Sequence, residues 1–217
     1  MATLQLFLGG TFNPVHIGHT RLALECHLRT GAGVAFVPCA DPPHKPHPEV
    51  SIAHRLSMLE LAVAELNAVV ANEATFTIDR CEIEEISGPS YTFNTLRHLR
   101  HLRPQEVLVW LIGMDSLVSL HTWHRWRELT DVANLLVINR PGWQRPHEGE
   151  VAEWLSERER SLEQLDAFGG VAFLETTPVA ISSTELRKQM AQGLTGKYLL
   201  PEPVQQYIQS HHLYLSH

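Results

Sequence analysis

Short apolar runs alternate along the chain with longer amphipathic segments. The apolar runs predict strands at Gln5 to Gly9, Gly33 to Val37, Phe76 to Ile78, Val107 to Ile112, Leu135 to Asn139 and Val171 to Glu175. The amphipathic segments predict helices at His16 to Leu28, Ala53 to Leu66, Thr92 to Leu102 and Val151 to Leu165. This alternation is typical of an α/β fold with a Rossmann-like, doubly wound parallel sheet covered on both faces. Such sheets bind ligands beyond the carboxyl ends of their strands, so functional residues are expected there.

Length and composition favour one compact unit. The 217 residues, 44% of them hydrophobic, can bury one sizeable core, and no segment resembles a linker, so residues 1–217 are expected to form a single domain. The sequence has no apolar run of membrane-spanning length and no basic stretch before its N-terminal apolar run, which predicts a cytoplasmic protein. Cys26, Cys39 and Cys81 form no CxxC pair, so we expect reduced thiols.

The charge balance bears on possible partners. A formal net charge of −7 disfavours broad nucleic-acid binding, which usually selects a basic face. An anionic ligand must therefore be held by local groups. Although the chain has 14 histidines, no spacing matches HExxH or a Cys/His finger, so no metal ligands from the protein are expected. No heptad repeat or long apolar edge indicates an oligomeric state.

The first predicted strand runs into a glycine turn and a helix start that carries two histidines. Gly9 and Gly10 allow a sharp turn with exposed N–H groups, and Pro14 fits the entry to a helix. The helix start offers unpaired N–H donors and the positive end of the helix dipole, which attract phosphate. His16 and His19 are three residues apart, so both side chains project from one face of the first turn. The alternative is an ordinary surface helix with two histidines.

Polar residues follow other predicted strands. After the second strand comes a proline-rich loop, residues 38–48, in which His44 and Lys45 can reach anionic oxygens or simply belong to a connector. After the fourth, Asp115 is placed to accept hydrogen bonds from ribose, and Gly113 lets a sugar or base approach. Asp115 can also cap the next helix. After the fifth, Arg140 stands where a phosphate would lie.

Two further segments have a chemical interpretation. Trp123, in the aromatic segment HTWHRW, can stack on a flat heteroaromatic ring or cover the edge of the core. Near the C-terminus, ISSTELR has Ser182 and Glu185 in the spacing of a capping box, which predicts a helix start. The hydroxyls there and Arg187 one turn later would add a second phosphate site to the one at the glycine turn.

The motifs together resemble one family. GGTFNPVHIGH is similar to the HxGH signature of the nucleotidyltransferase superfamily, and with PPHKP, PSYTFNTL, IGMDSL, TWHRW, NRPG and ISSTELR it resembles the bacterial nicotinate mononucleotide adenylyltransferases over nearly the whole chain. The resemblance implies a nucleotidyltransferase-type fold. It also implies transfer of AMP from ATP to nicotinate mononucleotide, with release of pyrophosphate and formation of deamido-NAD for NAD synthesis. The implied cofactor is Mg²⁺ carried by ATP.

The resemblance also assigns residues to roles. It implies that His16 and His19 are catalytic, that Gly113 and Asp115 hold a ribose, and that ATP phosphates meet Gly9, Gly10, Thr11, Phe12, Arg140, Ser182, Thr184 and Arg187. It implies a nicotinate mononucleotide subsite formed by His44, Lys45, Ser90, Tyr91, Thr92, Trp123 and His124. His124 departs from the family, in which an aromatic residue such as tyrosine is common there. Leu186 replaces a frequent isoleucine.

Three other functions are alternatives. A phosphopantetheine adenylyltransferase shares the start and end motifs but lacks the SYT and TW elements. An NAD-dependent oxidoreductase would need GxGxxG, which the sequence lacks. A non-catalytic nucleotide-binding protein would not need both HxGH histidines and Arg187. How strongly the site prefers nicotinate over nicotinamide mononucleotide is left open by the sequence.

Overall fold

Six parallel strands form one sheet in the computed structural model, which describes residues 3–42, 48–70, 75–139 and 142–215. The strands in this part of the chain have the order β3-β2-β1-β4-β5-β6. They are β1 (Leu4–Gly10), β2 (Gly33–Pro38), β3 (Phe76–Ile78), β4 (Val107–Gly113), β5 (Asn134–Ile138) and β6 (Val171–Leu174). The chain runs outward from β1 to β3 and then returns to the other side of β1, so the strand order reverses between β1 and β4. The doubly wound parallel sheet predicted from the sequence is confirmed.

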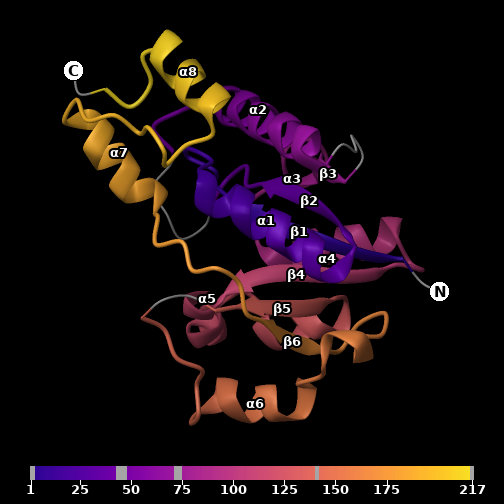
Figure 1. Cartoon of the computed structure of the whole chain (residues 1–217). Coiled ribbons are helices and arrows are strands. Elements are labelled where there is room, and N and C mark those ends of the chain that lie inside the picture. The colour runs from indigo at the N-terminus through magenta and orange to yellow at the C-terminus, as the bar shows by residue number, and fades with distance from the viewer. Residues whose placement is uncertain (1–2, 43–47, 71–74, 140–141, 216–217) are drawn as a thin grey trace.

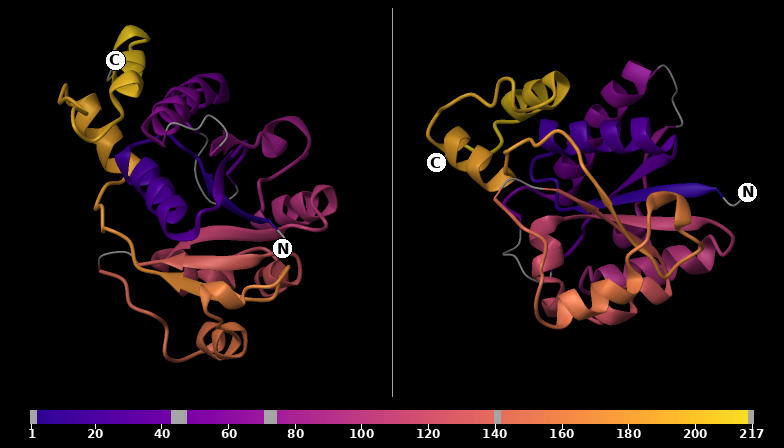
Figure 2. Two further views of the ribbon diagram at one scale, coloured as in Figure 1. Left: turned by 45° about the vertical axis from the view of Figure 1, so that its right-hand side comes forward. Right: turned by 60° about the horizontal axis from the view of Figure 1, so that its bottom comes forward.

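Helices cover both faces of the sheet (Figures 1 and 2). The described α-helices are α1 (Ile17–Thr30), α2 (Ile52–Val70), α3 (Cys81–Glu84), α4 (Thr92–Leu102), α5 (Met114–Val118), α6 (Glu150–Arg158), α7 (Ser183–Ala191) and α8 (Glu202–Ser210). Three 3₁₀ turns accompany them, η1 (Leu120–Thr122), η2 (Trp126–Asp131) and η3 (Leu162–Gln164). None of the helices in the described ranges is long and apolar enough to cross a membrane.

Alternate residues of each central strand feed two separate cores. In β1, Leu6 and Leu8 pack with α1, α2, α7 and α8, while Phe7 packs on the opposite face with α4, α5 and α6. The same alternation separates Val109 from Trp110 in β4. Because both faces are buried, nearly every position of these strands is apolar, which explains why they read as continuous runs in the sequence.

The carboxyl ends of β1 and β4 lie side by side at the switch point. Gly10 is in register with Pro38 of β2, and Gly113 with Ile138 of β5. A Cβ at Gly9 would overlap the indole of Trp110 on β4, so the close approach of these two strands requires glycine at this position. The predicted functional residues therefore have a common edge from which to meet.

Two expectations from the pattern are wrong. The helix expected from Val151 to Leu165 ends at Arg158, because the chain then pairs with β6: the N–H of Arg160 donates to the carbonyl of Val171 (3.0 Å), and η3 follows. Pro14 does not open a helix. It follows Asn13 through a cis peptide bond, and α1 begins three residues later, with His16 as its N-cap. Amphipathic periodicity indicates neither of these arrangements.

Candidate active site

The two histidines of HxGH lie at the start of α1. The backbone N–H of His16 donates to Nδ1 of His19 (3.2 Å), so His19 supplies the side-chain acceptor of a capping box. The two rings are stacked with their centroids 3.8 Å apart. A Cβ at Gly18 would lie 3.0 Å from the His16 ring, which explains the glycine between them. The expected pairing of both imidazoles on one face of the first turn is confirmed.

The loop between β1 and α1 is held from inside. Phe12 is buried at a positive φ of 47° and contacts the His19 ring edge-on, with centroids 5.1 Å apart. The guanidinium of Arg55 on α2 donates to the carbonyls of Thr11 (2.7 Å) and Cys39 (2.9 Å). Arg55 is only 2% exposed, and burial lowers the pKa of its guanidinium. It thereby ties the loops that follow β1 and β2 to one another.

Arg55 belongs to none of the motifs predicted from the sequence. It occupies the buried side of α2 together with Met58, Leu59 and Ala62. A charged residue within an apolar helical face is a readable signal, because such a residue is rarely buried without hydrogen-bond partners. The sequence alone does not show which carbonyls it would reach.

The ISSTELR segment forms a helix start beside the same loop. The Oγ of Ser182 accepts a hydrogen bond from the N–H of Glu185 (3.1 Å), which confirms the predicted cap of α7. Ser183 Oγ donates to the carbonyl of Pro14 (3.0 Å), and Arg187 Nη1 donates to the carbonyl of Asn13 (2.8 Å). The N-terminus of α7 and the loop before α1 are thus in direct contact, although 169 residues separate Ser183 from Pro14.

The segment that leads from β6 to α7 is anchored on α1. Glu25 accepts a hydrogen bond from the N–H of Thr177 (2.7 Å) and pairs with Arg21 (2.5 Å). Burial raises the pKa of Glu25, but the hydrogen bonds from Thr177 and Arg21 outweigh burial and leave it lowered. The two predicted phosphate sites are therefore fastened to one helix.

Gly113 and Asp115 lie where β4 passes into α5. Gly113 is the N-cap of α5, and a Cβ at this position would overlap Oδ1 of Asp115. The carboxylate therefore folds back over the strand end, close to the switch point. This position agrees with the ribose contact predicted for both residues, which stays a prediction.

Several residues of the predicted pyridine subsite are brought together. The N–H of Ser90 donates to the carbonyl of Asp41 (2.9 Å), and the N–H of Asp41 donates to Ser90 Oγ (3.2 Å). The rings of Tyr91 and His124 are stacked with centroids 4.5 Å apart, and Thr92 begins α4 immediately after Tyr91. The loop after β2, the SYT turn and the TW segment therefore meet, although they are far apart in sequence.

A buried carboxylate lies beneath the SYT turn. Glu82, on α3, is 6% exposed and accepts a hydrogen bond from Thr95 Oγ1 (2.6 Å). Burial raises the pKa of Glu82, against opposing hydrogen bonds from Thr95, Ser90 and Ala40. The sequence does not reveal Glu82, because nothing in a mainly acidic segment singles out one carboxylate as buried.

Trp123 is half-buried and packs against the core that contains α4 and α6. It follows η1 rather than lying on an α-helix, and Arg125, two residues later, adopts a positive φ of 54°. The alternative that this indole covers a core edge is thus met in part, and its stacking role stays a prediction. His44, Lys45 and Arg140 lie outside the described residues.

The chemistry of the site suits anionic oxygens. It gathers imidazoles, a guanidinium and helix-start N–H groups at the end of β1. Across the described ranges, no group of three or more His, Cys, Asp or Glu side chains is arranged to hold a metal ion. Such a site can bind phosphate and neutralise charge that develops on it.

Known proteins share both sequence and fold with this chain. A model of the cytidylyltransferase-like family matches residues 7–189. A probable nicotinate-nucleotide adenylyltransferase of Dechloromonas aromatica is 43% identical, covering 97% of this chain and 97% of its own. One of Hahella chejuensis is 39% identical, covering 96% of this chain and 94% of its own.

Solved structures support the fold. Plasmodium falciparum nicotinic acid mononucleotide adenylyltransferase complexed with NaAD has a TM-score of 0.76 to this chain, covering 98% of it and 97% of its own chain. A structure described as that of a putative nicotinate-nucleotide adenylyltransferase from Vibrio parahaemolyticus has a TM-score of 0.64 to this chain. It covers 98% of this chain and 95% of its own chain. Their identities, 16% and 13%, are low, so these likenesses concern the fold alone.

Proposed function

The chain belongs to the nicotinate-nucleotide adenylyltransferase family, and we propose that the residues at the ends of β1 and β4 perform that family's reaction. The enzyme transfers AMP from ATP to nicotinate mononucleotide, and nicotinate adenine dinucleotide and pyrophosphate are the products. The observation that carries the assignment of the site is the contact between α7 and the Asn13–Pro14 loop, which leads into the stacked His16–His19 pair. This contact supports the proposal because it joins the two segments to which phosphate binding is assigned.

The proposed chemistry is a direct displacement. An oxygen of the 5′-phosphate of nicotinate mononucleotide attacks the α-phosphorus of ATP, while the bond from this phosphorus to the oxygen bridging to the β-phosphorus breaks. No covalent enzyme intermediate is formed. The protein's contribution is to hold two polyanions in line and to stabilise the charge that develops on the leaving oxygen.

We assign this stabilisation to the two histidines, with His19 as the principal group. His19 is fixed by its stack on His16 and its contact with Phe12, so little reorganisation is needed when charge develops. The N–H groups of the loop, from Gly9 to Phe12, are proposed to line the phosphate path. The imidazole and guanidinium groups suit phosphate oxygens, so Mg²⁺ would be held by the triphosphate itself and would share charge neutralisation there.

The remaining assignments follow the position of each element. Ser182, Thr184 and Arg187 are proposed to bind the β- and γ-phosphates. Arg140, which follows β5 in the sequence, is proposed as a further phosphate ligand. Gly113 and Asp115 are proposed to hold a ribose. For nicotinate mononucleotide we propose stacking on Trp123 and carboxylate recognition by N–H groups near Ser90, Tyr91, Thr92 and His124, with His44 and Lys45 as further candidates.

The test is release of pyrophosphate from Mg-ATP in the presence of nicotinate mononucleotide, nicotinamide mononucleotide or phosphopantetheine, each in a separate assay. Release with nicotinate mononucleotide alone is expected. Equal release with both pyridine nucleotides would keep the reaction and remove the selectivity. Release only with phosphopantetheine, or binding of ATP without turnover, would support one of the two alternatives instead.

A further inference from the structure

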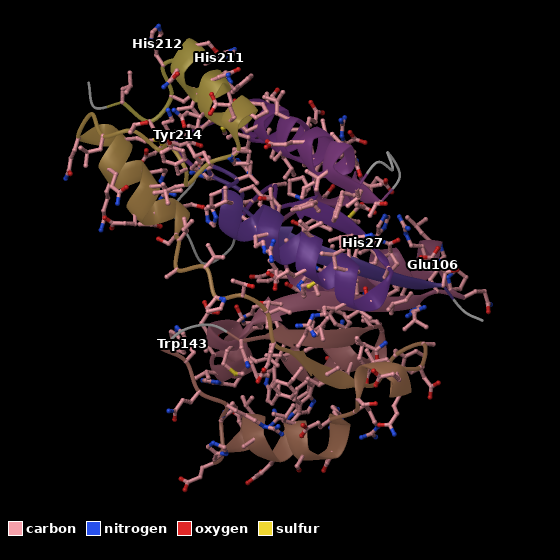
Figure 3. All side chains as sticks on the ribbon, viewed as in Figure 1. His27, Glu106, Trp143, His211, His212 and Tyr214 are labelled. Atoms are coloured by element: carbon pink, nitrogen blue, oxygen red, sulfur yellow. The ribbon has the colours of Figure 1, made fainter. Side chains whose placement is uncertain are left out.

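The last described residues return to the loop that precedes α1. After α8 ends at Ser210, the chain turns through Tyr214, which has a positive φ of 63° and is 7% exposed. Tyr214 lies in the angle between α7 and α8 (Figure 3). Its hydroxyl donates to the side-chain Oδ1 of Asn13 at 2.7 Å, a buried hydrogen bond across 201 residues of sequence. The segment after α8 is therefore hydrogen-bonded to the loop that leads into HxGH.

Asn13 receives hydrogen bonds from two segments at once. Its side-chain oxygen accepts from Tyr214, and its backbone carbonyl accepts from Arg187 Nη1 at 2.8 Å. Asn13 is itself only 6% exposed, so water competes little for these hydrogen bonds. The orientation of Asn13 consequently affects where the Arg187 guanidinium can lie.

The chemistry of the phenol fits a permanent donor. Burial raises the pKa of the Tyr214 phenol, although the charges of Arg187 and Arg55 act in the other direction. The hydroxyl therefore keeps its proton throughout the working pH range of an enzyme and can hold Asn13 continuously. A phenylalanine would fill the same apolar surroundings without this bond.

We propose that Tyr214 is a positioning residue for the triphosphate subsite: its hydroxyl orients Asn13, whose carbonyl holds Arg187 beside the start of α7. This inference rests on the proposed function, in which Arg187 binds the β- and γ-phosphates. Because Tyr214 touches Asn13 and not the reacting atoms, its loss acts on ATP binding more than on the chemical step.

The chain offers a matched control. Tyr207, on α8, also forms a hydrogen bond through its phenol hydroxyl, with Nδ1 of His54 at 2.9 Å, and this partner is on α2 and not in the Asn13 loop. Tyr207→Phe removes one phenol hydroxyl from the same C-terminal region. Comparison with Tyr214→Phe separates a general weakening of this region from loss of the specific bond to Asn13.

The experiment measures KM for ATP, KM for nicotinate mononucleotide, kcat and the melting temperature. For Tyr214→Phe we expect KM for ATP to rise about fivefold, the size of one net hydrogen bond, with kcat and the other KM nearly unchanged. Tyr207→Phe should leave both KM values unchanged. Equal kinetic effects of the two substitutions, no effect of Tyr214→Phe, or its failure to fold while Tyr207→Phe folds would overturn the proposal.

A double variant tests whether Tyr214 acts through Arg187. Arg187→Ala should raise KM for ATP by itself, and adding Tyr214→Phe should raise it little further, because residues in one network are not additive. Full multiplication of the two effects would contradict the proposed route. A wild-type enzyme without activity, or an Arg187→Ala variant with normal KM for ATP, would instead reject the proposed function or the role of Arg187.

Discussion

His19 is both a structural and a proposed chemical residue, because it occupies the third position of α1. Its Nδ1 accepts the N–H of His16, and its ring stacks on the His16 ring. Glutamine is a standard residue at this position of a capping box, since its side chain reaches back to the same N–H. A glutamine here would therefore preserve the cap while removing the imidazole.

We predict that His19→Gln lowers kcat by about 10²- to 10³-fold, the usual cost of removing one donor that stabilises developing charge. The free energy of unfolding of His19→Gln should stay close to wild type. For His19→Ala it should be lower by about 0.5–1 kcal/mol, because the cap is lost. Steady-state kinetics and urea unfolding measure both. His27→Gln, on the same helix, is the control and should keep kcat. A near-normal kcat for His19→Gln would assign His19 to capping only.

Glu82 shows how burial changes the behaviour of one carboxyl. Burial raises its pKa above the ordinary value of 4.5, so the folded protein binds its proton at a pH where the unfolded chain has released it. Stability from this proton is fully present below pH 4.5 and is lost as pH rises through the raised pKa.

We therefore predict that wild type loses stability relative to Glu82→Gln as pH rises above 4.5. Glutamine retains an oxygen that can accept the Thr95 hydroxyl, so the comparison isolates the ionisation. Chemical unfolding of both proteins between about pH 4 and 8, the range in which a carboxyl with a raised pKa titrates, gives the difference in their free energies of unfolding. A difference independent of pH, or one that favours wild type at higher pH, would contradict the raised pKa.

At the scale of elements, the ends of β1 and β4 use glycine for different reasons. A side chain at Gly9 would overlap the buried indole of Trp110, which belongs to the core. A side chain at Gly113 would overlap the carboxylate of Asp115, which can rotate away. The first glycine therefore serves packing between strands, and the second serves the position of a predicted ribose ligand.

This contrast predicts opposite effects for two alanine variants. Gly9→Ala should lower the free energy of unfolding by about 1–3 kcal/mol, as overpacking of a core does. Gly113→Ala should stay near wild-type stability but raise KM for ATP by displacing Asp115. Thermal unfolding and steady-state kinetics distinguish the two. Unchanged kinetics in a stable Gly113→Ala would remove Asp115 from the nucleotide site.

The segment between β4 and β5 carries two tryptophans with different environments. Trp126 is buried and contacts Trp154 edge-on, with centroids 5.4 Å apart. Trp123 is half-buried and directly precedes His124, whose ring stacks on Tyr91. The geometry of this segment depends on 3₁₀ turns and not on a continuous helix. It therefore leaves one indole partly accessible at the strand-end edge.

We predict that Trp123→Ala raises KM for nicotinate mononucleotide by about three- to tenfold, the value of a stack on a cationic ring, and leaves KM for ATP nearly unchanged. Trp126→Ala is the matched control and should instead destabilise the fold by about 3–5 kcal/mol. Separate titrations of the two substrates measure the difference. Equal losses for both substrates in Trp123→Ala would make this indole a packing residue.

At the scale of the whole molecule, the two cores depend on the same strands. The residues of β1 and β4 alternate between the core of α1, α2, α7 and α8 and the core of α4, α5 and α6. The helix α7 and the segment after α8 are also hydrogen-bonded to the loop after β1, through Ser183, Arg187 and Tyr214. Neither core can open without exposing the strands that support the other.

We predict one cooperative unfolding transition, with the calorimetric enthalpy equal to the van't Hoff enthalpy. Nicotinate adenine dinucleotide at about 100 times its dissociation constant should add about 2.7 kcal/mol to stability. Scanning calorimetry with and without this product measures both. Two separate transitions would contradict the single domain expected from the sequence.

Local sequence patterns were enough to predict the alternation of strands and helices, the parallel sheet, the cap of α7 and the grouping of residues at strand ends. These features depend on short-range periodicity and on residue types whose backbone preferences act locally. The proximity of His16 and His19 belongs here as well, because an N-cap residue and the third residue of its helix meet in a capping box.

Tertiary packing, and not local pattern, sets the contacts of Arg55 with Thr11, of Glu82 with Thr95 and of Tyr214 with Asn13. It also decided where the helix after Gly149 ends, since pairing with β6 stops it at Arg158. Each depends on a partner in a different element, and local preference does not specify which carbonyl or side chain a buried polar group will meet. The packing of the two cores brings these partners together.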